Sequence, residues 1–233
     1  MSRSKSSPCD YDVNPNRFRQ NVEATSRYSQ GDVHEEVADR LADVKMEPLL
    51  DLGCGEGRLV HPLRQNGVNV IAFDYSATML SSLSGQRVRG DATALPFRTG
   101  AFGAVAALYM LYHIAKPEDA LRESQRVLRR GGLFIACAPS RYNDPELAEV
   151  LPHYGEPATF DAENGPGLVS EQFVVTEIQW WDAPLIHLPD REALALYLAG
   201  RGLAKAEVER AVAKIQTPLA LTKRGMLLFA KKV

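Results

Sequence analysis

The stretch Leu49-Leu50-Asp51-Leu52-Gly53-Cys54-Gly55-Glu56-Gly57 decides the fold. Its first half predicts a short buried strand, beginning at Pro48, and its second half places glycines at alternate positions. Because glycine permits tight turns and close approach of the backbone to a ligand, we expect a strand, a glycine loop and a helix. Such a loop either binds a ligand or only makes a tight turn. A dinucleotide fingerprint is excluded, since Arg58 stands where its third glycine would come, and no Walker-type Gly-Lys-Ser/Thr follows.

Strands and helices alternate along the chain around this loop. The expected strands are 48–52, 68–73, 87–89, 104–109, 133–138, 172–181 and 225–233, and the expected helices are 33–44, 58–65, 77–83, 117–128, 190–200 and 205–215. Residues 133–138 are continuously apolar, which is typical of a parallel strand covered on both faces. The alternation predicts a doubly wound α/β sheet that binds its ligand at the C-terminal ends of the strands.

Length and composition exclude several classes of protein. With 233 residues, 45% of them hydrophobic and 24% charged, the chain is typical of a globular protein and not of a disordered or collagen-like one. A net charge of −2 gives no support to a nucleic-acid or membrane-surface partner. Three scattered cysteines without metal-ligand spacing, and no apolar run of about 20 residues, predict a cytoplasmic protein with no metal site and no membrane span.

The chain is expected to hold one domain with two attached segments. Residues 1–31 are predicted to be a partly flexible N-terminal segment that covers the site through Tyr11, Phe18 and Tyr28. Residues 32–233 form the single domain, and 139–218 within it contain the expected lid or insertion. This expectation rests on 141–170, which is rich in Pro, Gly, Asn and acids and has no clear periodicity, as in lids and binding loops.

Three acids stand at the ends of successive predicted strands. Asp51 precedes the glycines, where a carboxylate repels a pyrophosphate and attracts an ammonium. Asp74 ends the second strand, where an acid can accept hydrogen bonds from both hydroxyls of a ribose, and Asp91 follows the third. A single strand-end aspartate is as readily a cap or turn residue, but three in succession favour a binding site.

At this point the sequence resembles the class I S-adenosylmethionine-dependent methyltransferases. The resemblance covers about residues 33–138 and rests on five runs, in order. They are Leu50-Asp51-Leu52-Gly53-Cys54-Gly55-Glu56-Gly57, Phe73-Asp74-Tyr75-Ser76, Gly90-Asp91-Ala92-Thr93-Ala94-Leu95-Pro96-Phe97, Leu111-Tyr112-His113-Ile114 and Arg126-Val127-Leu128-Arg129-Arg130-Gly131-Gly132-Leu133-Phe134-Ile135. It implies a Rossmann-like, mostly parallel seven-stranded sheet with an antiparallel last strand and a lid or insertion after the fifth strand.

The resemblance also implies a binding role for particular residues. The glycine loop and Asp51 would hold the methionine end of S-adenosylmethionine, Asp74 the ribose, and Asp91 with Ala92 the adenine. Leu108 and Tyr109 would line the pocket near the sulfonium. The full set of expected cofactor residues is Tyr28, Asp51, Gly53, Cys54, Gly55, Gly57, Asp74, Tyr75, Met79, Asp91, Ala92, Leu108 and Tyr109. The chain departs from the family pattern at Gly103, where an acid is common, and at Tyr112, where many members have a second histidine.

The expected reaction is an in-line SN2 transfer of the methyl group to an oxygen or nitrogen of a small molecule, a specialised metabolite, leaving S-adenosyl-L-homocysteine. Orientation is the main requirement, and no metal is needed. His113, just after the fourth strand, is the candidate base, although a backbone hydrogen bond would equally explain it. His34 and His61 are assigned no role. Trp180 and Trp181, with Tyr154 and Phe160, are expected as core or as an apolar surface for a flat acceptor.

Two other functions remain open from the sequence. An RNA or protein methyltransferase on the same fold would need a basic pocket mouth, which the acids between 144 and 171 disfavour. A non-catalytic regulator that binds the cofactor would carry the same cofactor residues. We therefore expect a small-molecule acceptor, no membrane or nucleic-acid partner, and a monomer or homodimer.

Overall fold

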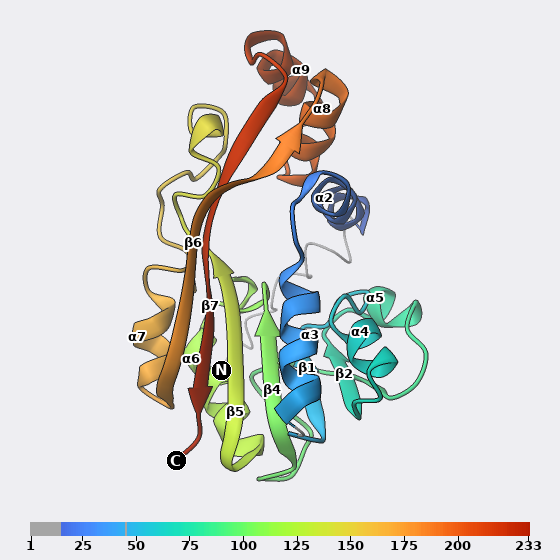
Figure 1. Ribbon diagram of the computed structural model, residues 1–233, viewed down its shortest axis with the longest axis vertical. Helices are drawn as coiled ribbons and strands as arrows, with labels where there is room; N and C mark the ends of the chain where they lie inside the picture. Colours follow the sequence, from blue (N-terminus) through green and yellow to red (C-terminus); the bar gives the residue numbers. More distant parts are fainter. Residues whose placement is uncertain (1–14, 45) are drawn as a thin grey trace, which may run out of the picture.

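A seven-stranded mixed sheet forms the centre of the molecule (Figure 1). The computed structural model describes residues 15–44 and 46–233. The strand order is β3-β2-β1-β4-β5-β7-β6, and β7 alone runs antiparallel to its neighbours β5 and β6. The strands are β1 (Leu49–Leu52), β2 (Val70–Asp74), β3 (Arg87–Arg89), β4 (Phe102–Leu108), β5 (Leu128–Pro139), β6 (Val174–Leu188) and β7 (Leu219–Lys231). The doubly wound, mostly parallel sheet expected from the sequence is confirmed.

Helices cover both faces of this sheet (Figure 1). The helices of the described residues are α2 (Pro15–Tyr28), α3 (Val33–Val44), α4 (Val60–Gln65), α5 (Ala77–Ser81), α6 (Pro117–Val127), α7 (Gly165–Ser170), α8 (Arg191–Gly200) and α9 (Lys205–Lys214), with short 3-10 turns η1 (Leu111–His113) and η2 (Pro145–Leu147). One face is covered by α3, α4 and α5, and the other by α6 and α7. Strands β1 and β4 are buried along their whole length because both faces are covered, so they read as continuous apolar runs.

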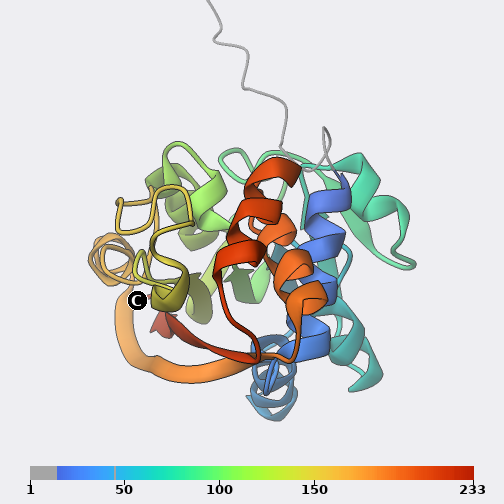
Figure 2. The same ribbon diagram turned by 90° about the horizontal axis from the view of Figure 1, so that it is seen from above.

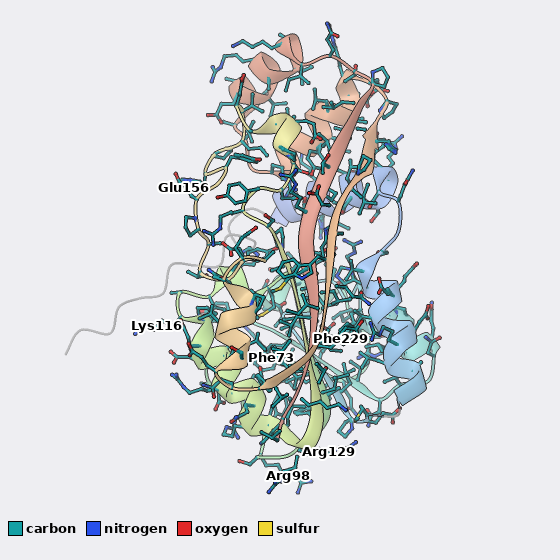
Figure 3. All side chains as sticks on the ribbon, turned by 60° about the vertical axis from the view of Figure 1, so that its left-hand side comes forward. Phe73, Arg98, Lys116, Arg129, Glu156 and Phe229 are labelled. Atoms are coloured by element: carbon teal, nitrogen blue, oxygen red, sulfur yellow. The ribbon has the colours of Figure 1, made fainter. Side chains whose placement is uncertain are left out.

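Each face of the sheet has its own hydrophobic core. Phe134 of β5 packs with α6 and stacks on Phe173 at 4.6 Å between ring centroids. On the other face, Phe229 of β7 packs toward α3 (Figure 3). The Arg40 guanidinium of α3 lies 3.9 Å from the centroid of the Phe229 ring. Arg40 also pairs with Glu177 of β6 at 2.7 Å. These cores fix the register of the strands. The register in turn sets where the loops at the C-terminal ends of the strands lie relative to one another.

Strands β6 and β7 continue beyond the sheet as a two-stranded ribbon and carry a second layer of structure. We call this part the outer lobe; it consists of α2, α8, α9, η2, residues 182–188 of β6 and residues 219–224 of β7. It has a separate hydrophobic core, with Leu147, Leu194, Tyr197, Leu198 and Leu221 fully or almost fully buried. Figure 2, viewed from above, shows α2, α8 and α9 lying together over the end of the sheet.

Both ribbon strands are longer than the sequence predicts. The expected strands 172–181 and 225–233 stop where the sheet stops, but β6 runs to Leu188 and β7 begins at Leu219. In the ribbon, Ala183 pairs with Lys223 and Leu188 with Leu219, and the register shifts between Pro184 and Ile186. The ribbon is covered on one side only, by the outer lobe, and it contains polar residues and a proline. Its sequence therefore lacks the continuous apolar run by which the central strands could be predicted.

A buried carboxylate ties the loop after β5 to the outer lobe. Asp144 accepts hydrogen bonds from the Tyr197 hydroxyl and from Lys223 Nζ, both at 2.7 Å, and pairs with Arg201. Burial by itself would raise the pKa of Asp144, but Arg201 and Lys223 outweigh it and keep that pKa below its usual value. Removing one partner from such a network is costly, so this loop is fixed and not a free connector. The short helix α7, at the end of the segment 141–170, was not expected from the sequence.

Candidate active site

The glycine loop turns sharply away from β1 at residues 53–57. Gly53, Gly55 and Gly57 have φ angles of 73°, 53° and 91°, a region that other residues rarely adopt. At Gly53 a side chain would also collide with its surroundings, because a Cβ atom there would lie 2.6 Å from Cβ of Met110. Met110 follows β4, so the glycine loop and the end of β4 touch each other directly.

Asp51 is a buried acid whose charge lacks a partner. Its side chain is almost fully buried at the end of β1, and its Oδ2 atom has no hydrogen-bond partner among the residues that the structure describes. Burial, and then the nearby charge of Asp74, raise its pKa to about 8. An ammonium group beside Oδ2 would complete this site, and the amino group of S-adenosylmethionine has that chemistry. The residue therefore fits the cofactor that the sequence implies.

Asp74 links the second strand to the glycine loop. Its Oδ2 accepts a hydrogen bond of 2.9 Å from the backbone N–H of Gly55, and its Oδ1 accepts one of 2.8 Å from Ser76 N–H. Ser76 in turn caps α5, where its hydroxyl accepts from the N–H of Met79 at 3.2 Å. Asp74 thus lies at the C-terminal end of β2, next to the glycine loop, where the sequence resemblance places the contact with the ribose hydroxyls.

The third acid and its neighbours lie further along the same edge. Asp91 is exposed after β3, and its Oδ1 accepts from both the backbone N–H and the hydroxyl of Thr93, at 2.8 and 2.7 Å. Ala92 and Met79 are buried, whereas the ring of Tyr75 is 44% exposed and accessible to a ligand. Since β1, β2 and β3 are parallel neighbours, the structure brings Asp51, Asp74 and Asp91 to one edge of the sheet.

Tyr109 stands at the end of β4 in an unusual backbone conformation. Its φ of 55° is a left-handed conformation that costs energy in a residue other than glycine and recurs at functional sites. Leu108 before it is buried. Its backbone N–H donates to the Cys137 carbonyl at 3.0 Å, and burial, reinforced by the neighbouring Cys137, raises the pKa of Tyr109 well above its usual value. The phenol therefore keeps its proton.

A histidine and two charged residues, to which the sequence motifs assign no role, lie at this place. Asp32, His34 and Arg58 form a cluster next to Tyr109: Arg58 donates to Asp32 Oδ2 at 2.7 Å, and His34 Nδ1 lies 2.8 Å from Asp32 Oδ1. The His34 ring lies 5.9 Å from the Tyr109 ring, between centroids. Asp32 directly precedes α3, and no local pattern in the sequence indicates that a residue 75 positions away packs on His34.

His113, the base expected from the sequence, lies in η1 after β4. Its ring is exposed and lies 4.4 Å from the ring of Tyr112, between centroids.

Cys54 is a buried thiol whose pKa is raised far above its ordinary value, by burial first and then by the charges of Asp51 and Asp74. It therefore does not act as a nucleophile.

Of the residues expected to cover the site, the structure describes the side chain of Tyr28, which lies in the outer lobe. Tyr28 packs against the core of that lobe, and the Arg27 guanidinium lies 5.6 Å from its ring centroid. Tyr11 and the side chain of Phe18 lie outside the described part of the chain. Within the described residues, no helix is both long enough and apolar enough to cross a membrane.

Some of the aromatic residues expected to form core or an acceptor surface are buried, and others are exposed to solvent. Phe160 is fully buried, Trp181 is half-buried, and Trp180 is 59% exposed. Both tryptophans border a hollow of about 320 Å³ at the C-terminal end of β5, which is lined by Ser140, Ala162, Glu163, Trp180, Trp181, Asp182, Arg224 and Gly225. In Figure 3 the loop before α7 runs along the outside of the molecule, with Glu156 at its outer edge.

Comparison with known proteins agrees with this geometry. A family model described as "Methyltransferase domain" matches residues 50–136. A demethylmenaquinone methyltransferase of Clavibacter sepedonicus is 31% identical over 180 residues, which are 72% of this chain and 69% of that protein. A putative methyltransferase of Bacillus halodurans C-125 superposes with a TM-score of 0.64 at 18% identity, covering 85% of this chain and 98% of that one. The [4+2]-cyclase SpnF also has a TM-score of 0.64, at 17% identity, and the match covers 99% of both chains.

Proposed function

The chain belongs to the class I S-adenosylmethionine-dependent methyltransferases, and we propose that it methylates an oxygen or nitrogen of a small, partly apolar molecule, such as a specialised metabolite. The observation that carries the cofactor assignment is the buried Asp51 carboxylate, which has no partner among the described residues and lies below the glycine loop. A cationic ligand explains why such a group is kept there, because an unpaired buried charge is otherwise costly.

The chain's own residues would bind and orient the reactants. When bound, S-adenosylmethionine supplies an electrophilic methyl group on a sulfonium. Asp51 would pair with its ammonium group, Asp74 would accept from its ribose hydroxyls, and Asp91 with Ala92 would contact its adenine. Leu108 and Tyr109 would line the sulfonium side. Aligning an acceptor in this way supplies several kcal/mol, up to about 7–11 in favourable systems. His113 was the candidate base from the sequence; it is exposed in η1 near the end of β4, and it is the alternative to the base that we argue for below.

Two observations support a small acceptor with a flat apolar part. The hollow at the end of β5 offers the exposed Trp180 ring, and its size suits a small molecule. One relative is named for demethylmenaquinone, a small molecule. The hollow also carries Glu163 and Asp182, but Arg141 pairs with Glu163 at 3.3 Å and Arg224 with Asp182 at 3.0 Å, so the charge of its lining is balanced.

The acids between residues 144 and 171 argue less strongly against a polyanionic acceptor than the sequence suggests. Asp144 and Asp161 are buried, and Asp161 pairs with Arg141 at 2.8 Å. Glu146 accepts from the N–H of Thr222 at 3.0 Å. These acids hold the loop together, so the acidic surface that repels a polyanion is smaller than the count of residues implies.

A labelled methyl-transfer assay tests the proposal. The protein would be incubated with S-adenosylmethionine carrying a tritiated methyl group and, separately, with 2-prenyl-1,4-naphthohydroquinone, a panel of catechols and aromatic amines, and total RNA. We expect label in the small molecules with the wild type and at least tenfold less with Asp51→Asn. Label in RNA alone would overturn the proposal. Binding of S-adenosylhomocysteine without transfer to any acceptor would favour the non-catalytic regulator.

A further inference from the structure

We propose that His34, oriented by Asp32, is the general base that takes the proton from the methyl acceptor. The inference rests on the proposed methyl transfer and assigns a residue to it that the sequence motifs do not include. His34 belongs to the first turn of α3, and Figure 1 shows this end of α3 level with the C-terminal end of β4.

Asp32 fixes both the position and the tautomer of the imidazole. One oxygen, Oδ1, accepts from the backbone N–H of His34 and lies at hydrogen-bond distance from its Nδ1, each at 2.8 Å. A carboxylate can only accept, so the proton of the neutral ring lies on Nδ1 and the lone pair lies on Nε2. The other oxygen of Asp32 accepts from Arg58 at 2.7 Å. The same arrangement of carboxylate and imidazole orients the base in hydrolytic triads.

The dyad lies where the reaction would take place. Arg58 directly follows the glycine loop, and Tyr109, whose ring lies 5.9 Å from that of His34, directly follows β4. These two places are the ones proposed to hold the methionine end and the sulfonium of the cofactor. The His34 side chain is only 12% exposed, so bulk water does not compete for its lone pair.

Burial, more than the charges around His34, lowers the pKa of its imidazole and favours the neutral ring. Burial lowers its pKa most strongly, Asp32 acts in the opposite direction, and Arg58 lowers the pKa further. Tyr109 faces it from the end of β4 and keeps its own proton, because burial raises the pKa of its phenol. A neutral, oriented imidazole near pH 7 is what general-base catalysis needs.

In the proposed step, His34 removes the acceptor's proton as the methyl group is transferred. Nε2 forms a bond to the proton of the acceptor's O–H or N–H group, and the electron pair of the broken bond stays on the acceptor atom. That atom forms the new bond to the methyl carbon, and the pair of the broken sulfur–carbon bond returns to sulfur. The products are the methylated acceptor, S-adenosylhomocysteine and the imidazolium of His34. The imidazolium then loses its proton to water.

The first test needs no acceptor. Imidazole ¹⁵N spectra of the wild type, assigned with His34→Gln, should show the Nδ1–H tautomer of His34 and a pKa below the ordinary value of about 6.5. Asp32→Asn should remove this fixed tautomer, while the asparagine still caps α3. A wild-type His34 that carries its proton on Nε2, or that titrates at the ordinary value, would overturn the proposal.

The second test separates proton transfer from cofactor binding. With 2-prenyl-1,4-naphthohydroquinone as the acceptor, His34→Gln should lower kcat about 100-fold or more. Its Kd for S-adenosylhomocysteine should stay within threefold of the wild type, and the exposed His187→Ala serves as the control with unchanged kcat. The acid limb of the wild-type rate should follow the pKa from the spectra. A large loss of S-adenosylhomocysteine affinity in His34→Gln would make His34 a cofactor ligand and overturn the proposal.

The same assay distinguishes the two proposals. If the wild type methylates none of the small molecules, the proposed acceptor class fails, and the dyad is then judged on its tautomer and pKa alone. If the wild type is active and His34→Gln is equally active, the methyl transfer stands and the dyad proposal is wrong.

Discussion

The backbone N–H of Gly55 donates a hydrogen bond of 2.9 Å to the carboxylate of Asp74. The acid at the end of the second strand thus holds in place the glycine loop that follows the first strand. Asp74 is therefore more than a ligand for a ribose, because the shape of the loop that would hold the methionine end of the cofactor depends on it.

Replacing Asp74 should weaken both the loop and the binding of the cofactor. Asp74→Ala removes two acceptors from backbone N–H groups, so we expect a loss of about 2 kcal/mol in the free energy of unfolding. The Kd for S-adenosylhomocysteine should rise at least tenfold by calorimetry. Asp74→Asn keeps one acceptor oxygen and should lie between the two. Unchanged affinity in Asp74→Ala would show that this carboxylate does not serve the cofactor.

Gly53 should tolerate no side chain. In Gly53→Ala the new Cβ would press on Met110 at a left-handed backbone position, so the expected loss of stability is about 2–4 kcal/mol in urea unfolding. Gly67→Ala is the matched control, because Gly67 has a similar φ of 75° with open space around it. It should lose only about 1 kcal/mol. Equal losses in the two variants would mean that the contact with Met110 has no energetic importance.

The outer lobe should depend on close packing of α2 against α8. A Cβ at Gly200 would lie 2.8 Å from Cα of Asn21, so Gly200→Ala should displace α2. We expect faster proteolysis near residues 15–28 and a higher KM for the acceptor, with the Kd for S-adenosylhomocysteine unchanged. Gly167→Ala in α7 has open space and should show neither effect. Parallel loss of cofactor affinity in Gly200→Ala would place the cofactor, not the acceptor, beneath this lobe.

The sequence predicted the central sheet well because its signals are local. Residues 133–138 are apolar without interruption, and the glycines after Asp51 mark one particular turn. The ribbon of β6 and β7 beyond the sheet could not be predicted in the same way, since pairs such as Ala183 with Lys223 and Pro184 with Thr222 form only in the context of the outer lobe.

The predicted site was incomplete for the same physical reason. Asp51, Asp74 and Asp91 could be placed together because parallel strands end at one edge of the sheet. The contacts of Met110 with Gly53 and of His34 with Tyr109 join residues far apart in the chain, and no spacing in the sequence encodes them.

The raised pKa of Asp51 predicts a pH-dependent stability. The carboxyl titrates near 4 when unfolded and at about 8 when folded, so the folded state binds more protons between these values. The free energy of unfolding of the unliganded protein should therefore fall as pH rises from about 4 to 8. Asp51→Asn cannot ionise, so its stability relative to the wild type should increase from pH 5 to pH 8. Parallel curves for the two proteins in thermal unfolding would contradict this.

Calorimetric titration with S-adenosylhomocysteine at pH 7, in buffers of different ionisation enthalpy, tests the central claim most directly. An ammonium beside Asp51 favours the ionised carboxylate, so binding should release close to one proton, ~0.9 for a group with a pKa of about 8. Asp51→Asn should bind at least tenfold more weakly and release none. The absence of binding, or equal binding by both proteins with no proton released, would contradict the assignment of this buried acid to the cofactor.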